Sequence, residues 1–388
     1  MNTSGRTRFR IGIDAHAVGS HVGGNESYIL SIIEGLGEFP QHDYFIYVVD
    51  ATAADKVRSL CPGATVRVIH AHNRLVRLGW RLTQACRLDR VDVLHVQYVG
   101  PLVTPPLVAM IHDLSYHHHP EWFTRNESLR LQLTVRWTAR RAARILTASD
   151  FCRRDIITTL RVPDDKVRVS HHRVRSTFRE RPQSEVNALL QTLGVRRPYV
   201  LTVGNLQPRK NLPRLIDAWR RLRAQHADFR PQLVIVGRKA WMFDDILSAA
   251  RQETSSGDLV LTDYLPEADL PALYSGASVF VYPSLFEGFG LPPLEAMACG
   301  APVIVSNTSS LPEACGDAAA YIDPSSVDDM ASRMLELFRD SELQRTFREK
   351  GFHQARRFRR SNLMEVTTRA WEEAALLNET SLLKRHRQ

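Results

Sequence analysis

The stretch VFVYPSLFEGFGLPPLE, residues 279–295, joins a short apolar run to a glycine-containing loop and a pair of prolines. Its first four residues, Val279–Tyr282, have the β-branched and aromatic side chains typical of a buried strand. Pro292 and Pro293 suit the first turn of a helix, because the N–H groups of that turn have no partner within the helix. A strand, a loop and a helix in this order predict one unit of a parallel α/β sheet.

The same alternation runs along the whole chain. In the first half, apolar runs predict strands at 9–14, 44–50, 65–69, 92–96, 107–111 and 144–148. Helical periodicity separates several of them, at 26–36, 73–88, 126–143 and 150–160. The second half predicts strands at 199–203, 232–236, 259–262, 279–282 and 302–306. Its helices are predicted at 211–226, 242–254, 267–275 and 293–299, and residues 326–386 are predicted to be helical. The pattern predicts an α/β fold with two doubly wound parallel sheets and a linker near 175–185.

Charge is the unusual part of the composition. Lys and Arg number 51 against 42 Asp and Glu, which gives a formal net charge of +9, and only six of the basic residues are lysines. An arginine-rich surface suits phosphate groups, so nucleic acid, anionic lipid and nucleotide phosphates are candidate partners. A bias in genome base composition explains the same excess equally well. Hydrophobic residues make up 44% of the chain, and no apolar run reaches the roughly 18 residues of a membrane helix. A folded protein without a membrane span is therefore expected.

The loop at 286–295 has features of an anion-binding site. Gly288 and Gly290 let a ligand approach the backbone closely. The N-terminus of the following helix offers N–H groups and positive potential to an anion. Glu287 and Glu295, eight residues apart, suit hydroxyl groups on two parts of one ligand. Taken alone, the loop has a simpler interpretation as a glycine-proline turn with a capping glutamate.

A second motif, GNLQPRKN at 204–211, directly follows a predicted strand. Arg209 and Lys210 stand at the start of a helix, where cations oppose the helix dipole, so they make a poor structural cap. They make a good clamp for a diphosphate, and a solvated charge pair is the alternative. A third candidate is His112, at the end of a strand in the first half, because histidine is the polar group best suited to a pocket near neutral pH.

Together, these motifs resemble those of the retaining glycosyltransferases of GT-B fold, family GT4 (glycosyltransferase group 1). Glu287 and Glu295 match the E-x7-E motif of that family, and Arg209 and Lys210 match its phosphate clamp in the form PRKN. The N-terminal glycine-rich loop of the family is matched by Gly23-Gly24. Three further stretches are similar to a branch rich in bacterial mannosyltransferases of surface polysaccharide assembly: IHDLSYHHHPEWF, GRKAWMFDDIL and YPSLFEGFGLPPLEAMACGAPVIVSNTSSLPE.

The resemblance implies two Rossmann-like domains that face each other across a cleft. It implies that 1–177 binds the acceptor, that 178–360 binds a nucleotide sugar, and that 361–388 is a C-terminal helix crossing back to the first domain. The implied activity is hexosyl transfer with retention, with GDP-mannose as the favoured donor and UDP-glucose or UDP-N-acetylglucosamine as the alternative. The implied acceptor is a saccharide or a lipid-linked saccharide of surface polysaccharide synthesis.

The resemblance also implies roles for individual residues. His112 is expected beside the donor sugar, Arg209 and Lys210 at the diphosphate, and Glu287 at the sugar hydroxyls. Glu295 is expected to accept hydrogen bonds from the ribose. The other donor-binding positions that it implies are Gly23, Gly24, Gly204, Tyr264, Leu265, Phe289, Gly290 and Leu291.

Neither a metal nor another cofactor is expected. The chain contains no D-x-D triplet, so no obvious carboxylate cradle for Mg²⁺ is present. The run His117–His119 does not predict a metal site, because consecutive side chains cannot all face one ion. Family members of this fold generally use positive side chains instead of a metal. Retention in the family is usually explained by same-face attack, with the leaving phosphate taking the acceptor proton, so no enzyme nucleophile is predicted.

A basic helix in the first half predicts a peripheral membrane contact. Residues 74–90 have helical periodicity, with Arg74, Arg77 and Arg81 in line beside an apolar face and Trp80 off that face. Such a helix can lie on anionic lipid, and a core helix with a solvated arginine face is the alternative. The expected location is the cytoplasm, with contact at the inner face of the plasma membrane.

Other classes of function remain as alternatives. Nucleic-acid binding is not predicted, because only the net charge supports it and no helix-turn-helix, zinc or aromatic RNA signature is visible. A GT-B epimerase, phosphorylase or glycosidase would share the fold and change the reaction. A non-catalytic sugar-binding relative would also share the fold, although the complete set of motifs disfavours it.

Overall fold

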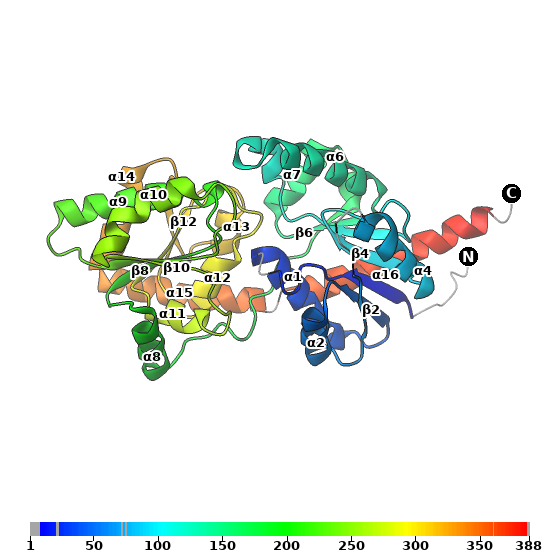
Figure 1. Ribbon diagram of the computed structural model, residues 1–388, viewed down its shortest axis with the longest axis horizontal. Helices are drawn as coiled ribbons and strands as arrows, with labels where there is room; N and C mark the ends of the chain where they lie inside the picture. Colours follow the sequence, from blue (N-terminus) through cyan, green and yellow to red (C-terminus); the bar gives the residue numbers. More distant parts are fainter. Residues whose placement is uncertain (1–7, 21–22, 71–72, 74–75, 360, 386–388) are drawn as a thin grey trace. The chain divides into compact units, whose positions relative to one another are not determined.

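The computed structural model describes the chain except for residues 1–7, 21–22, 71–72, 74–75, 360 and 386–388. It divides into two compact units. Unit 1 comprises Met1–His118, Arg125–His172 and Ser361–Gln388, and unit 2 comprises His119–Thr124 and Arg173–Arg360. Both units are α/β and each contains one parallel sheet with helices on its two faces (Figure 1). The prediction of an α/β fold with two doubly wound sheets is therefore confirmed.

The sheet of unit 1 has its strands in the order β3-β2-β1-β4-β5-β6-β7, all parallel. These strands are β1 (Arg10–Asp14), β2 (Asp43–Val48), β3 (Thr65–Val68), β4 (Val93–Gln97), β5 (Leu107–Met110), β6 (Arg144–Thr147) and β7 (Val167–Val169). The order reverses at β1, which pairs with β2 on one side and with β4 on the other. In open sheets of this type, ligands bind at the carboxyl ends of the strands where the order reverses.

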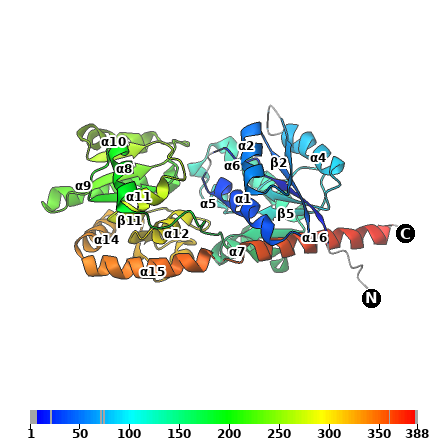
Figure 2. The same ribbon diagram turned by 90° about the horizontal axis from the view of Figure 1, so that it is seen from below.

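Helices cover both faces of this sheet. They are α1 (Gly23–Gly35), α2 (Ala51–Leu60), α4 (Leu82–Leu88), α5 (Ser115–His118), α6 (Arg125–Arg141), α7 (Asp150–Leu160) and α16 (Leu363–Arg385). In Figure 2, β5 lies between α6 above and α16 below. Trp371 anchors α16, because its ring is fully buried and its Nε1–H donates to His95 Nδ1 at 3.1 Å. The C-terminal helix is thus part of unit 1, although unit 2 precedes it in the sequence.

Unit 2 has the strand order β10-β9-β8-β11-β12-β13, again parallel. Its strands are β8 (Tyr199–Val203), β9 (Gln232–Val236), β10 (Leu259–Thr262), β11 (Val279–Tyr282), β12 (Val303–Ser306) and β13 (Ala320–Ile322). Its helices are α8 (Gln183–Leu193), α9 (Leu212–Gln225), α10 (Asp244–Ser256), α11 (Leu270–Gly276), α12 (Leu291–Ala298), α13 (Leu311–Cys315), α14 (Val327–Arg339) and α15 (Ser341–Arg359). The strand order reverses at β8 and β11, so the carboxyl ends of these two strands are the expected ligand site of unit 2.

Several predicted boundaries differ from the structure. The segment 73–88 was predicted as one helix, but Arg77–Arg81 (η2) forms a π-helical turn before α4 begins. The predicted helical stretch 326–386 is divided into α14, α15 and α16. Edge strands β7 and β13 were not predicted, because three residues are too short to show an alternating pattern. Among the described residues, no helix is long and apolar enough to cross a membrane.

Candidate active site

Arg209 and Lys210 lie in a tight turn after β8. The 3₁₀ turn Pro208–Lys210 (η5) ends at Asn211, whose φ of 57° is left-handed. Asn211 accepts this conformation at little cost because its short side chain can hydrogen-bond locally. Its Nδ2 donates to Pro283 O at 3.1 Å and to Pro324 O at 2.7 Å, and Arg209 O accepts from Leu285 N at 2.8 Å. These bonds fix the two cations against the loop that follows β11.

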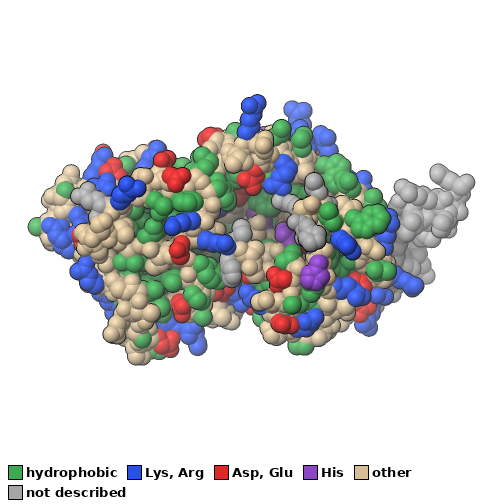
Figure 3. Space-filling view, viewed as in Figure 1, with side chains coloured by type: hydrophobic (Ala, Val, Ile, Leu, Met, Phe, Trp, Pro, Cys, Tyr) green, Lys and Arg blue, Asp and Glu red, His purple; other side chains and the backbone are tan. Residues whose placement is uncertain are grey.

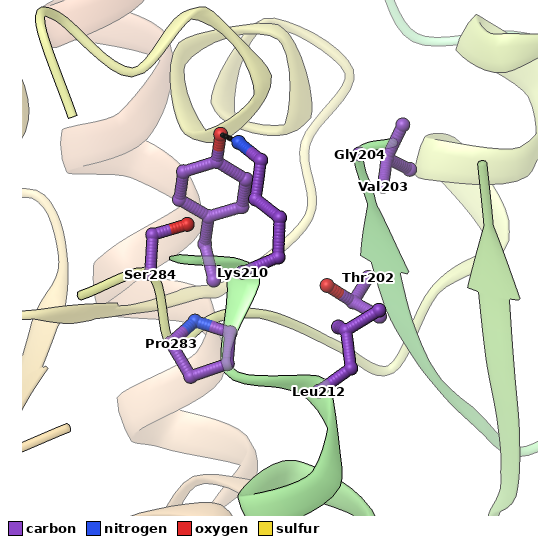
Figure 4. Close-up of a pocket in the computed structure, with 8 residues that line it drawn as sticks. Thr202, Val203, Gly204, Lys210, Leu212, Pro283 and Ser284 are labelled. Carbon is purple, nitrogen blue, oxygen red and sulfur yellow. Dashed lines mark hydrogen bonds between the residues drawn. The ribbon is translucent and has the colours of Figure 1, made fainter. Parts of the chain in front are cut away.

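A three-residue ion cluster forms at this contact. Lys210 Nζ lies 2.6 Å from Glu287 Oε1, and Arg209 NH1 lies 2.8 Å from Glu287 Oε2. Lys210 also donates to the hydroxyl of Tyr282, and its Nζ is 4.6 Å from the centre of that ring. Figure 4 shows Lys210 reaching along a small pocket that Ser284, Thr202 and Gly204 also line. The structure thus brings Glu287 to Arg209 and Lys210, which precede it by 78 and 77 positions in the chain.

Lys210 and Glu287 of this cluster are buried, so the interactions between its charges are strong. Lys210 is 7% exposed and Glu287 is 6% exposed, which excludes the alternative of a solvated charge pair. Burial alone would raise the pKa of Glu287, but Arg209 and Lys210 lower it to about 2. Glu287 is therefore ionised at neutral pH and holds the two cations in place. A basic site arranged in this way can accept a diphosphate, with the carboxylate left to bind hydroxyl groups.

The backbone of the glycine loop is held by two serines. Glu287 N donates to Ser309 Oγ at 3.0 Å, and Ser310 Oγ donates to Glu287 O at 2.8 Å. Gly290 has a φ of 95° and caps α12, and a Cβ there would lie 2.6 Å from Leu311 Cδ2. Pro292 and Pro293 lack N–H groups, so the first turn of α12 offers donors only at Leu291 and Leu294. The helix terminus is therefore a weaker anion site than the sequence suggested, and the two cations carry most of the positive charge.

Glu295 lies on α12 and has a different environment from Glu287. Its Oε2 accepts a hydrogen bond from Tyr274 OH at 3.3 Å. Burial raises the pKa of Glu295 to about 8, the Glu267 carboxylate adds to the rise, and Tyr274 and Arg175 oppose it. The unliganded protein thus holds Glu295 largely protonated at neutral pH, ready to exchange a hydrogen bond with a ligand hydroxyl. Of the other positions in unit 2, Phe289 and Leu291 are buried. In the loop after β10, Tyr264 is exposed and Leu265 is partly buried.

Replacing Glu295 by glutamine should flatten the pH dependence of stability. The pKa of Glu295 is higher in the folded protein than in the unfolded chain, so the folded state binds more protons. Its contribution is complete below about pH 4.5 and is lost as the pH rises through about 8. We expect Glu295→Gln to match the parent closely at pH 5 and to exceed its free energy of unfolding by roughly 4 kcal/mol at pH 9. Urea titrations at both pH values measure these free energies. A difference between variant and parent that is the same at pH 5 and at pH 9 would contradict the raised pKa of Glu295.

Gly204 lines the pocket next to Lys210, and a neighbouring glycine explains how the loop fits. A Cβ at Gly237, which follows β9, would lie 2.0 Å from Gly204 O. The two loops after β8 and β9 therefore touch through their backbones. Gly237 is the first residue of the stretch GRKAWMFDDIL, but the sequence had not indicated this contact. Tyr282, Ser309 and Ser310 were also missed, although Tyr282 stands at the carboxyl end of β11, where site residues are expected.

Unit 1 contains the remaining predicted residues. Gly23 and Gly24 begin α1, and Gly23 has a φ of 47°. His112 follows β5 and is 8% exposed, with its Nε2 2.8 Å from Gln97 Oε1. An amide oxygen only accepts, so His112 carries its proton on Nε2. Burial lowers the pKa of His112 to about 3 and His95 adds to this effect, so His112 is neutral. A neutral imidazole with a lone pair on Nδ1 can accept a hydrogen bond from a sugar hydroxyl.

The predicted arginine surface on residues 74–90 needs correction. Arg77 is 7% exposed and its NH1 lies 2.7 Å from the buried Asp14 carboxylate, so it cannot face a membrane. Arg77 is the first residue of the π-helical turn η2, and the simple helical periodicity did not reveal its buried partner. Arg81 is exposed, and Arg74 lies outside the described residues. In the run 117–119, His118 pairs with Asp155 and His119 with Glu121, and no His, Cys, Asp and Glu cluster suited to a metal occurs in the described part of the chain.

The fold and the basic site together define a class of protein. HepE from Anabaena, solved in complex with UDP and glucose, has the same fold, with a TM-score of 0.70 over 90% of this chain and 95% of that chain, at 18% identity. The chain therefore has the GT-B fold.

Sequence comparison then gives the family. Residues 191–354 match the model "Glycosyl transferases group 1" and residues 22–178 match "Glycosyltransferase Family 4". O-antigen chain mannosyltransferase B of Escherichia coli is 34% identical over 266 residues, which are 68% of this chain and 70% of that relative. O-antigen chain mannosyltransferase RfbU of Salmonella typhimurium is 30% identical over 224 residues, 55% of this chain and 56% of that relative. The chain belongs to the group 1 glycosyltransferases, with a family 4 domain in its first half.

Proposed function

We propose that this glycosyltransferase moves mannose from GDP-mannose to a saccharide or lipid-linked saccharide, with retention, in the synthesis of a surface polysaccharide. The observation that carries the proposal is the buried cluster of Arg209, Lys210 and Glu287 at the carboxyl ends of β8 and β11. Breaking a sugar–phosphate bond leaves negative charge on the diphosphate. Two fixed cations in a buried site stabilise that charge without reorganisation.

Each residue of the cluster has its own part in the proposed reaction. Arg209 and Lys210 neutralise the departing diphosphate, and Glu287 exchanges part of its contact with them for hydroxyl groups of the sugar. Glu295 binds the ribose hydroxyls from α12. The diphosphate takes the acceptor proton on the face it leaves, so the configuration is retained and no enzyme nucleophile takes part. The two cations fill the role of a metal ion, and the proposal includes none.

The choice of donor rests on relatives rather than on the geometry of the site. Two of the most similar relatives are mannosyltransferases of O-antigen chains, which favours mannose and a surface polysaccharide. HepE, which shares the fold at low identity, binds UDP. A UDP-sugar is therefore the second candidate donor.

A thermal-shift panel without metal tests the donor. We expect GDP and GDP-mannose to stabilise the protein, while UDP, ADP, UDP-glucose and UDP-N-acetylglucosamine do not. A ligand at 100 times its dissociation constant adds about 2.7 kcal/mol to the free energy of unfolding, which gives a measurable shift. A shift with the uridine series alone would replace GDP-mannose by a UDP-sugar. No shift with any nucleotide, with or without Mg²⁺, would contradict the proposed site.

We also propose that unit 1 contacts an anionic membrane, through a surface that keeps Trp80 and Arg81 of the one the sequence suggested but excludes Arg77. Trp80 is 67% exposed beside the exposed Arg81. Thr83 Oγ1 on α4 donates a hydrogen bond to Val103 O, and Gly100 N donates one to Thr138 Oγ1 on α6. The loop at 100–104 therefore connects α4 with α6. Figure 3 shows hydrophobic and basic side chains near these helices. The exposed apolar residues of η2, α4, the loop at 100–104 and α6 are Trp80, Leu88, Leu102, Val103, Leu129 and Leu133.

Vesicle sedimentation tests this contact. The parent should bind vesicles that contain phosphatidylglycerol more tightly than neutral ones, because both apolar area and cations contribute. Replacing Trp80 and Leu133 by serine should lower that binding about tenfold. Leu376 and Leu377, exposed on α16, provide a matched control pair. Equal binding of parent and Trp80/Leu133 variant would overturn the contact.

A further inference from the structure

A serine with a left-handed backbone lies against the loop at 283–290, and the proposed reaction gives it no part. Ser309 follows β12 and has a φ of 54°. For a residue with a Cβ this region costs free energy, whereas glycine adopts it freely. Unit 2 has glycine at comparable positions, such as Gly194 and Gly257 at the ends of α8 and α10. The hydroxyl group of Ser309 is what a glycine at this position would lack.

That hydroxyl group connects two stretches of backbone. Ser309 Oγ donates to Thr308 O at 2.8 Å, and this bond uses its single proton. The same oxygen accepts a hydrogen bond from Glu287 N at 3.0 Å. Because the proton is committed to Thr308 O, the oxygen presents a lone pair to Glu287 N. The local bond thus orients the hydroxyl group as an acceptor for the loop at 283–290.

The neighbours of Ser309 hold the same loop. Ser310 is fully buried, and its Oγ donates to Glu287 O at 2.8 Å. Thr308 Oγ1 donates to Leu285 O at 3.4 Å. The segment after β12 therefore contacts both the N–H and the C=O of Glu287, and Ser309 supplies the contact with the N–H.

Strained backbone is concentrated around this loop. Among the described residues of unit 2, the non-glycine residues with a positive φ are Asn211, Met242 and Ser309. Asn211 donates to Pro283 O and Ser309 accepts from Glu287 N, so two of these residues hold the loop at 283–290. Residues in such conformations cluster at active sites, where the surrounding structure keeps them strained.

The proposed part of Glu287 requires a fixed backbone. Its carboxylate contacts Arg209 and Lys210, and in the proposed reaction it exchanges part of these contacts for sugar hydroxyls. A side chain that changes partners stays correctly directed only if its own backbone is held by surrounding hydrogen bonds. A small displacement of a group that positions substrate lowers the rate strongly.

We infer that Ser309 is a positioning residue, whose hydroxyl oxygen fixes the Glu287 backbone so that the carboxylate meets the sugar hydroxyls of the donor. The serine is retained in a left-handed conformation for this contact. The inference rests on the proposed function, because it requires Glu287 at the sugar. It predicts that stability and activity respond differently when the side chain of Ser309 is removed.

The experiment compares two variants that both lack the hydroxyl group. Ser309→Gly also removes the strain, whereas Ser309→Ala keeps it, so the glycine variant should melt about 3 °C above the alanine variant. Both variants should lower kcat about 30-fold, because Glu287 loses its anchor in each. The donor is the nucleotide sugar selected by the thermal-shift panel, methyl α-mannoside is the probe acceptor, and release of the nucleoside diphosphate gives the rate. The dissociation constant of the nucleoside diphosphate should stay within about twofold of the parent's value, because the diphosphate contacts Arg209 and Lys210.

Arg161 provides a matched control for the strain. It is exposed, and its φ of 55° at the end of α7 is close to that of Ser309. Arg161→Gly should melt about 3 °C above Arg161→Ala, and both should retain the parent's kcat. Ser309→Thr keeps the hydroxyl group on a β-branched side chain, which tolerates a positive φ poorly. It should melt below the parent and retain at least about a third of the parent's kcat.

The outcomes separate the inference from the proposed function. A kcat of Ser309→Gly within about threefold of the parent's would overturn the inference. A loss of activity that follows the melting temperature, with Ser309→Ala much less active than Ser309→Gly, would also overturn it, because the role would then be structural. If Glu287→Gln transfers at the parent's rate, the proposed function of the site fails and the inference fails with it. If Glu287→Gln loses transfer while Ser309→Gly keeps it, only the inference fails.

Discussion

Replacing Lys210 by alanine should lower the rate of glycosyl transfer by about 1000-fold. Lys210 is buried between Tyr282 and Glu287, where water cannot replace its charge. The loss of a preorganised donor to a developing negative charge costs roughly 3–4 kcal/mol in the transition state. The result should appear in kcat, because the interaction strengthens as the diphosphate departs. Steady-state rates of nucleoside diphosphate release measure it.

The control for this variant is a lysine outside the site. Lys350 is partly exposed and pairs with Asp317 at 3.0 Å on the surface. Lys350→Ala should retain the parent's kcat, because an exposed pair of this kind contributes little. If Lys210→Ala keeps more than a tenth of the parent's kcat, Lys210 does not have the proposed role in the reaction.

Replacing Glu287 by glutamine should lower the free energy of unfolding of the unliganded protein. It should also increase the stabilisation that a bound nucleotide provides. The carboxylate pairs with both Arg209 and Lys210, so its loss leaves the buried Lys210 and the partly buried Arg209 next to each other without a counter-charge. Removing one member of a buried ion cluster destabilises a protein by about 3 kcal/mol or more. A bound diphosphate supplies the missing negative charge, so the thermal shift with nucleoside diphosphate should be larger in Glu287→Gln than in the parent. Transfer should be lost as well, because the sugar hydroxyls lose their acceptor.

The pH dependence separates this effect from a general loss of packing. The pKa of Glu287 is lowered by its cations, so its contribution is complete above about pH 4.5 and is lost as the pH falls towards 2. The difference in stability between parent and Glu287→Gln should therefore shrink in acid. Glu336, exposed and paired with Arg333 on α14, gives a matched control in Glu336→Gln. Equal melting temperatures of parent and Glu287→Gln at pH 7 would contradict the ion cluster.

Two points of the site show where sequence reasoning is strong. Arg209 and Lys210 were singled out because cations are unfavourable at a helix N-terminus, and the structure places them in a turn where Glu287 neutralises them. The E-x7-E spacing identified Glu287 and Glu295, but it did not show that their environments shift their pKa values in opposite directions. That difference arises because the partners of each carboxylate come from other strands and helices.

The sequence by itself determined the α/β class, most of the strands and the motifs of unit 2. This information is local, because a strand, a glycine loop and a helix start each depend on residues that are close along the chain. Tertiary structure decided where Arg77 points and which group neutralises Asp14. Arg77 is 63 positions from Asp14, so a helical pattern along the chain could not reveal the buried carboxylate that it contacts and assigned it to the wrong face. The family resemblance implied that the C-terminal helix returns to the first domain, but only the structure gives the physical reason, which is the burial of Trp371 and its bond to His95, 276 positions away.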